Sequence, residues 1–133
     1  MLPEVLALLA EAHLALGERA EAVATAREGI ELGRAGGCYY YEAQAQLALA
    51  AALLTDGVVL RAEIESALER AEQLVESIDG RSLSPRILEM RGRLATTLGD
   101  AAASERLLRQ ALDLYRAIGA TGHARRLAKE SGA

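Results

Sequence analysis

The sequence of 133 residues has no Phe, no Trp and only four Tyr, so aromatic rings contribute little to its interior. It has two prolines and few β-branched residues, which disfavours β-strands. The most abundant residues are Ala, with 28 copies, and Leu, with 23. Because neither side chain loses much conformational freedom in a helix, this composition predicts an all-α protein.

A lone cysteine, Cys38, leaves the chain without a pair for an internal disulfide or a second thiol for a metal site. Such cysteine usage is typical of a reducing compartment, and we expect a cytoplasmic protein. The N-terminus carries Glu4 and Glu11 and no basic segment, which is unlike a signal peptide. The longest wholly apolar run, 47–54, is far shorter than the ~20 residues that span a bilayer.

Positive charge is not in excess, because the formal net charge is -4 at pH 7. Binding to nucleic acid and to anionic membranes depends on clustered Lys and Arg side chains. We therefore expect neither nucleic acid nor a membrane as a partner.

The sequence also lacks a recognisable catalytic constellation. The glycine-rich stretches "LGRAGG" and "AIGATGHA" have no following Lys-Ser or Lys-Thr, and we interpret their glycines as helix ends. His13 and His123 have no His or Glu neighbour at metal-ligand spacing, so we expect His13 to pack and His123 to start a helix. No catalytic, cofactor-binding or metal-binding residue is assigned, and no cofactor is expected.

Evenly spaced glycines indicate an internal repeat. Gly17, Gly57 and Gly99 lie in the similar segments "LALGERAEA", "LLTDGVVLRAEIESA" and "TTLGDAAAS". Each segment is followed by an apolar helical pattern that ends in glycine. Helix, short turn, helix and glycine stop, three times over, is typical of an α-solenoid.

Helix ends and buried faces follow from local chemistry. Asp100 and Ser84 are predicted N-caps and Pro85 is a predicted first-turn residue, while Gly33, Gly80 and Gly119 lie near predicted C-terminal stops. Apolar residues at helical spacing predict the packed faces. These faces are Leu2, Leu6, Leu9, His13 and Leu16 in the first helix; Leu88, Gly92, Ala95 and Leu98 in the fifth; and Leu107, Leu108, Ala111, Leu114, Tyr115 and Ile118 in the sixth.

The segments "LAEAHLALGERAEAVATAREGIEL" and "RGRLATTLGDAAASERLLRQALDLY" resemble tetratricopeptide repeats. The matching positions are Gly17 and Gly99 for the turn glycine, Ala22 and Ser104 for the small residue that opens the second helix, and Gly29 and Ala111 for a later small residue. The chain departs from the repeat where a tyrosine, a large aromatic residue or a proline is usual, at His13, Ala95, Ala26, Leu108, Arg34 and Arg116. Small aliphatic residues are therefore expected to fill the seam between helices.

A period of ~40 residues, the enlarged middle turn "TDGVVLRAE" and the closing "LYRAIGATGHARRLAKE" are similar to the C-terminal helical region of large bacterial signalling proteins. In that family the helical repeats follow an ATPase module. The other end of such a chain carries a class III nucleotide cyclase or a helix-turn-helix transcription regulator. The resemblance implies that this chain is a regulatory piece of such a protein, whose parent has adenylate or guanylate cyclase activity or regulates transcription.

The predicted architecture is an α-solenoid of three antiparallel helix pairs and a short C-terminal capping helix, forming a single domain over 1–133. The repeats are expected at about 1–37, 38–80 and 83–120, with the cap at 121–131. Leu8 and Leu14 on the outer face of the first helix are expected to be covered, either by a preceding repeat of the parent or by a second copy in a homodimer.

The three consecutive tyrosines cannot share one helix face, because successive residues turn by ~100°. Tyr40 is assigned to core packing, Tyr39 to the preceding helix, and Tyr41 to a groove lined by the first helix of each pair. The predicted groove residues are Glu4, Glu11, Tyr41, Gln44, Arg86, Glu89 and Arg93. Acidic residues at one end, a tyrosine in the middle and arginines at the other suit an extended or helical peptide.

The sequence favours a non-catalytic interaction or regulatory module that binds a protein or peptide, including other domains of its own parent chain. A stand-alone adaptor that binds a peptide in the groove is the alternative. An enzyme is the third hypothesis, and no acid, base, nucleophile or metal set in the sequence favours it.

Overall fold

The computed structural model of the protein describes the backbone of residues 3–56, 60–78 and 81–131 and the side chains of residues 5–56, 60–78 and 81–130. These residues form α-helices and one short 3-10 helix, with no strand among them. The all-α prediction is therefore confirmed. The helices are α1 (Pro3–Ala15), α2 (Arg19–Gly36), α3 (Tyr39–Leu54), α4 (Arg61–Ile78), η1 (Arg81–Leu83), α5 (Ser84–Thr97), α6 (Ala101–Ala117) and α7 (Thr121–Ser131).

Four helix ends share one turn chemistry. Gly17, Gly37, Gly99 and Gly119 have φ between 65° and 82°, a conformation that only glycine adopts without strain. At each of them the next residue donates its backbone N–H to the carbonyl five residues earlier, as in Glu18 to His13 and Asp100 to Ala95. This is the Schellman motif, which satisfies the free carbonyls of a helix end. The predicted stop at Gly119 is confirmed, whereas Gly57 and Gly80 lie outside the described residues.

One predicted helix end is confirmed and one predicted cap is wrong. Helix α2 ends in glycine close to Gly33, as predicted, since it continues to Gly36 and is capped by Gly37. Gly33 is buried inside the helix, where a Cβ atom would lie 3.0 Å from the backbone nitrogen of Glu42. Ser84 is the first residue of α5 rather than its cap, which is Leu83 at the end of η1. The Asp100 cap is confirmed, since its carboxylate accepts the N–H of Ala103 at 3.1 Å.

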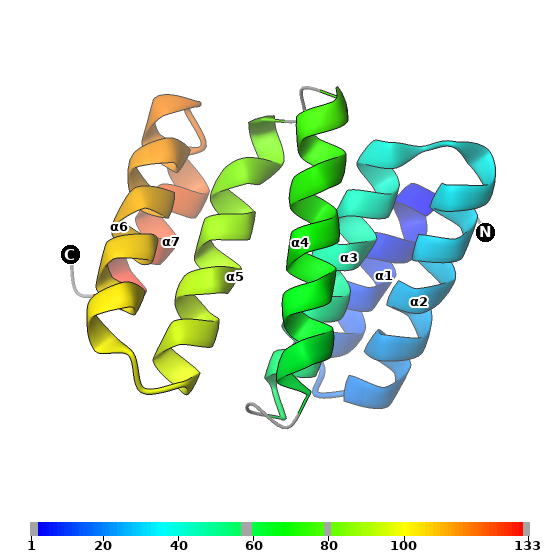
Figure 1. Ribbon diagram of the computed structural model, residues 1–133, viewed down its shortest axis with the longest axis horizontal. Coiled ribbons are helices and arrows are strands. Elements are labelled where there is room, and N and C mark those ends of the chain that lie inside the picture. Colours follow the sequence, from blue (N-terminus) through cyan, green and yellow to red (C-terminus); the bar gives the residue numbers. More distant parts are fainter. Residues whose placement is uncertain (1–2, 57–59, 79–80, 132–133) are drawn as a thin grey trace. The chain divides into compact units, whose positions relative to one another are not determined.

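The chain divides into two compact units, Met1–Gly80 and Arg81–Ala133. In the first, α3 packs against α1, α2 and α4, with α1 also against α2 (Figure 1). Almost every residue of α3 from Glu42 to Leu53 is buried, because neighbours contact it on several sides. The small residues Ala22, Ala26 and Gly29 form the inner face of α2, which confirms the expected aliphatic seam.

The second unit contains η1, α5, α6 and α7, and α6 packs against both α5 and α7. Its core cluster contains Ala111, Leu112, Tyr115, Ala124 and Leu127. Gly92 of α5 lets α6 come close, since a Cβ there would lie 2.8 Å from the Leu108 side chain. The division into three repeats and a cap, the solenoid arrangement and the single domain remain predictions.

The predicted packed faces are correct in the middle of the helices and wrong at their ends. Leu6, Gly92, Ala95, Ala111 and Tyr115 are buried. Leu16, Leu98 and Ile118 are exposed because each lies just past the last helical residue, where the chain turns away from the stripe. Leu114 is also exposed, although it lies within α6.

Candidate functional site

The predicted groove residues of the first unit lie on α1 and α3. Tyr41 and Gln44 are half-buried and one helical turn apart, so their side chains share a face of α3. Glu11 is half-buried on α1, which packs against α3. The side chain of Glu4 lies outside the described residues. A role for these residues in binding remains a prediction.

The tyrosine assignments change in the structure. Tyr40, expected in the core, is 36% exposed, and Tyr39 is 47% exposed. Burial on α3 begins only at Glu42, so the tyrosines occupy the first turn, before the helix enters the core. Tyr41 is the least exposed of the three, and its ring meets that of Tyr40 edge-on at 5.7 Å between centroids.

The three predicted groove residues of the second unit lie on α5, where Glu89 and Arg93 form an ion pair. Glu89 is only 4% exposed, and Arg93 donates to its Oε2 from Nη2 at 2.7 Å. Arg126 of α7 donates to both oxygens of Glu89, at 2.8 and 3.1 Å. Arg93 and Arg126 also share the carboxylate of Glu130. Glu89 and Arg93 thus both form ion pairs with residues of α7. The side chain of Arg86 is half-buried.

Tyr115 of α6 completes this cluster. Its hydroxyl donates to Glu89 Oε1 at 2.9 Å, so Glu89 connects α5, α6 and α7. Burial raises the pKa of the Tyr115 hydroxyl, and the negative charge of Glu89 raises it further. The His123 ring stacks on Tyr115 at 5.0 Å between centroids. His123 therefore covers the tyrosine ring in addition to lying in the first turn of α7, as predicted.

Electrostatics favour the ionised form of Glu89. Burial by itself would raise its pKa, but hydrogen bonds from Arg126, Arg93 and Tyr115 outweigh this effect and lower the pKa to about 2. The hydrogen bond to Glu89 and the negative charges of Glu89 and Glu130 raise the pKa of Arg126. A carboxylate with so low a pKa is a weak base near neutral pH, and its bonds to α5, α6 and α7 suit it to holding the three helices together.

A second buried carboxylate, Glu42, was missed by the sequence reasoning. It is fully buried at the start of α3 and accepts Arg70 Nε at 3.0 Å, Arg34 Nε at 3.2 Å and Gln46 Nε2 at 3.4 Å. Burial would raise its pKa, but the bonds from Arg70 and Gln46 and the charges of Arg70 and Arg34 lower it. The available signal was that Glu42 is the one charged residue of α3, and a buried charge requires a partner.

Polar contacts also involve His13 and Cys38. His13, expected to pack on the apolar stripe, is half-buried and its Nδ1 lies 3.0 Å from Glu18 Oε1. Cys38 occupies the N-cap position of α3, with its Sγ 3.7 Å from the carbonyl oxygen of Gly36. Within the part of the chain that the structure describes, no group of three or more His, Cys, Asp or Glu is arranged to hold a metal ion.

One helix carries apolar residues on both faces. Leu6, Ala7 and Ala10 of α1 are buried, and the opposite face carries Val5, Leu8, Ala12 and Ala15, all exposed. Leu16 continues that face just beyond the helix end and is 76% exposed, while Leu8 is 67% exposed. We call Val5, Leu8, Ala12, Ala15 and Leu16 the α1 stripe. A helix that is apolar all round is usually buried on both sides.

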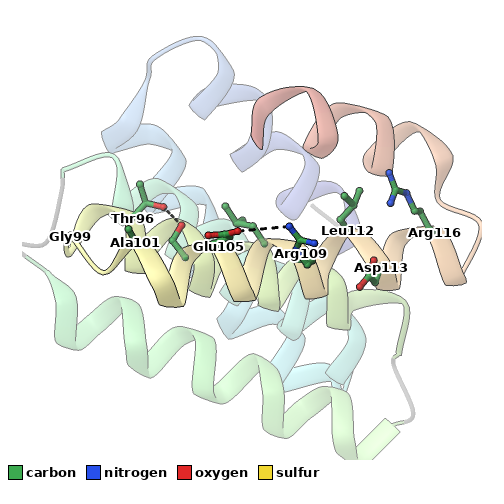
Figure 2. A pocket seen from close by; sticks show the side chains of 10 residues that line it. Thr96, Gly99, Ala101, Glu105, Arg109, Leu112, Asp113 and Arg116 are labelled. Carbon is green, nitrogen blue, oxygen red and sulfur yellow. Dashed lines mark hydrogen bonds and ion pairs between the residues drawn. The ribbon is translucent and has the colours of Figure 1, made fainter. Parts of the chain in front are cut away.

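Hollows lie on the surface of both units. The first unit has a polar one of about 500 Å³ between α2 and α4, over Gln46 and Leu49 of α3, where Arg27 forms an ion pair with Glu63. In the second unit a groove of about 780 Å³ follows α6 and the end of α5 (Figure 2). Its lining residues, here called the α6 groove, are Thr96, Gly99, Ala101, Ser104, Glu105, Leu108, Arg109, Leu112, Asp113 and Arg116.

Comparison with known proteins places the chain in no family. No protein-family model, curated protein or solved structure matches it. No helix in the described ranges is long and apolar enough to cross a membrane.

Proposed function

We propose that the chain is a non-catalytic protein-interaction module whose α1 stripe packs against an apolar helical segment of another protein or of another part of a longer chain. The observation that supports this proposal is that α1 carries apolar residues on two opposite faces. Its inner face is already buried against α2 and α3, so the exposed stripe serves no packing within the first unit. Contiguous exposed apolar surface is typical of interaction sites.

The stacking of helical hairpins in the first unit supports a helical partner for the α1 stripe. The packing of α3 against α1 and α2 stacks one hairpin on the next, and the α1 stripe presents a comparable surface to a further hairpin. The resemblance to tetratricopeptide repeats agrees with such a partner. In the bacterial signalling proteins that the sequence resembles, the partner is a neighbouring helical repeat, and the module regulates an ATPase-linked cyclase or transcription regulator.

Tyr41 and Gln44 favour a second candidate, an adaptor that binds a peptide in a groove over α1 and α3. Both side chains are half-buried on one face of α3, next to α1. In the second unit, α7 already engages Glu89 and Arg93, so a peptide-binding groove would use the first unit.

Site-specific photo-cross-linking in cells that produce the protein tests both candidates. A cross-linking residue replaces Leu8 in the α1 stripe, Tyr41 in the groove, or Leu32, a comparably apolar exposed position on α2 that serves as the control. We expect a discrete protein adduct from Leu8 that is lost in a Leu16→Lys background. An adduct from Tyr41 alone would favour the adaptor. Adducts from neither position, or equally from Leu32, would contradict both.

A further inference from the structure

The α6 groove has a regular charge order along one helix. Glu105, Arg109, Asp113 and Arg116 follow one another at steps of four, four and three residues, so they lie along one side of α6 (Figure 2). Ala101, Leu108 and Leu112 form the apolar floor beside them, and Thr96 and Gly99 close one end. The groove thus combines an apolar floor with a rim of alternating charge.

This order is complementary to itself when reversed. If a second α6 lies antiparallel in the groove, Glu105 meets Arg116 of the second copy, and Arg109 meets Asp113 of the second copy. Two-fold symmetry forms each of these contacts twice, because in an isologous interface residue i contacts j and j contacts i. A parallel second helix would instead place each charge beside its own copy, which is unfavourable.

The charges of the rim are available for such contacts. The carboxylate of Glu105 lies 3.8 Å from Arg109, with both side chains more than 70% exposed. An exposed pair of this kind contributes little to stability, so exchanging it for a contact between chains costs little. Within the described residues, Asp113 and Arg116 form no ion pair. Leu112, which is 5% exposed, belongs to the core of the second unit, so the contacts between copies depend on the four charged side chains.

We propose that the protein self-associates through the α6 groove as an antiparallel, two-fold symmetric dimer held mainly by Glu105–Arg116 and Arg109–Asp113 contacts between copies. This interface is separate from the α1 stripe, and the proposal does not rest on the proposed function. Because its charges are solvent-exposed, the dimer should weaken as salt screens them. A dimer formed by the apolar α1 stripe would not weaken in this way.

Sedimentation equilibrium of the full chain, from about 10 µM to about 1 mM at low and at high salt, tests the proposal. We expect a concentration-dependent dimer whose dissociation constant rises at high salt. The Arg109→Glu variant and the Asp113→Arg variant should each raise the dissociation constant about tenfold or more, because each places like charges together. The double variant, which exchanges the two charges, should restore it to within a few-fold.

Arg125→Glu is the matched control, since Arg125 is exposed on α7, outside the α6 groove, and its replacement makes the same charge change. Circular dichroism should show equal helicity in all variants. A chain that stays monomeric over this range overturns the proposal. A dimer whose dissociation constant is unchanged in both single variants overturns it as well. So does a dissociation constant that the double variant fails to restore. None of these results bears on cross-linking from Leu8.

Discussion

In this protein the carboxylates of two buried glutamates join neighbouring helices by hydrogen bonds and ion pairs. With few aromatic residues, the second unit uses Glu89 to join α5, α6 and α7 through Arg93, Tyr115 and Arg126. The first unit uses Glu42 to bring together Arg34 of α2 and Arg70 of α4. We expect a buried carboxylate of this kind to favour one arrangement of the helices, because another arrangement would leave a buried charge without a partner.

The pKa of Glu89 leads to a prediction at the residue scale. Its folded-state pKa of about 2 lies below the ordinary 4.5, so the carboxylate stabilises the fold above about pH 4.5 and loses this effect as the pH falls toward 2. We expect Glu89→Gln to lower the free energy of unfolding by about 3 kcal/mol at pH 7 and by less than about 1 kcal/mol near pH 2.

Urea unfolding of the wild type and the variant across this pH range measures the difference. Glu105→Gln serves as the control, because Glu105 is exposed and forms only a loose pair with Arg109. A difference between wild type and Glu89→Gln that stays constant from pH 7 to pH 2 would show that Glu89 is not held ionised by its arginines.

Among the elements, α2 and α3 meet at a glycine rather than at a pair of large side chains. A Cβ on Gly33 would lie 3.0–3.1 Å from the backbone nitrogen, Cα and Cβ of Glu42. Backbone atoms at the start of α3 cannot move aside without disturbing the Glu42 hydrogen bonds. This close approach explains why a poor helix former occurs in the interior of α2.

Gly33→Ala should therefore destabilise the protein by about 1–3 kcal/mol, although alanine favours helix. Gly36→Ala in the same helix is the matched control, since its Cβ would meet only Cys38 Sγ, at 3.4 Å. That variant should be unchanged or up to about 1 kcal/mol more stable. Thermal and urea unfolding of the two variants provide the comparison, and equal effects would contradict the close approach of α2 and α3.

Over the whole molecule, burial is unevenly distributed among the helices. Residues 42–53 of α3 are buried on nearly every side, whereas α1 is open along its stripe and α7 is short and largely exposed. Local opening costs least where few buried side chains lose their neighbours. Stability is thus expected to be greatest at α3 and least in α1 and α7.

Hydrogen exchange followed by NMR tests this order on the full chain. Amides of residues 46–53 should exchange at least about tenfold more slowly than those of residues 9–15 and 124–130. If a dimer or another partner covers the α1 stripe under the conditions used, only the α1 amides should slow. Amides of α7 that exchange as slowly as those of α3 would contradict the expected order.

Much of the helical framework is determined locally. Each described hairpin falls within a predicted segment, because glycine at positive φ and the Asp100 cap act over a few residues of chain. The apolar spacing likewise marks the centres of the packed faces. It fails at Leu16, Leu98 and Ile118, since a period continues in the sequence beyond the residue at which the helix ends.

The sequence by itself determined the all-α class, the helical hairpins and the apolar centres of their faces, because these depend on neighbours within one or two turns of helix. Tertiary structure decided which polar residues are buried and which are available. Gly33 is a point of contact between α2 and α3, Glu42 is a central partner, and Glu89 is bonded by Arg126, 37 residues further along the chain. Such pairings depend on how helices distant in the sequence pack together, and the residue pattern within one helix does not indicate this packing.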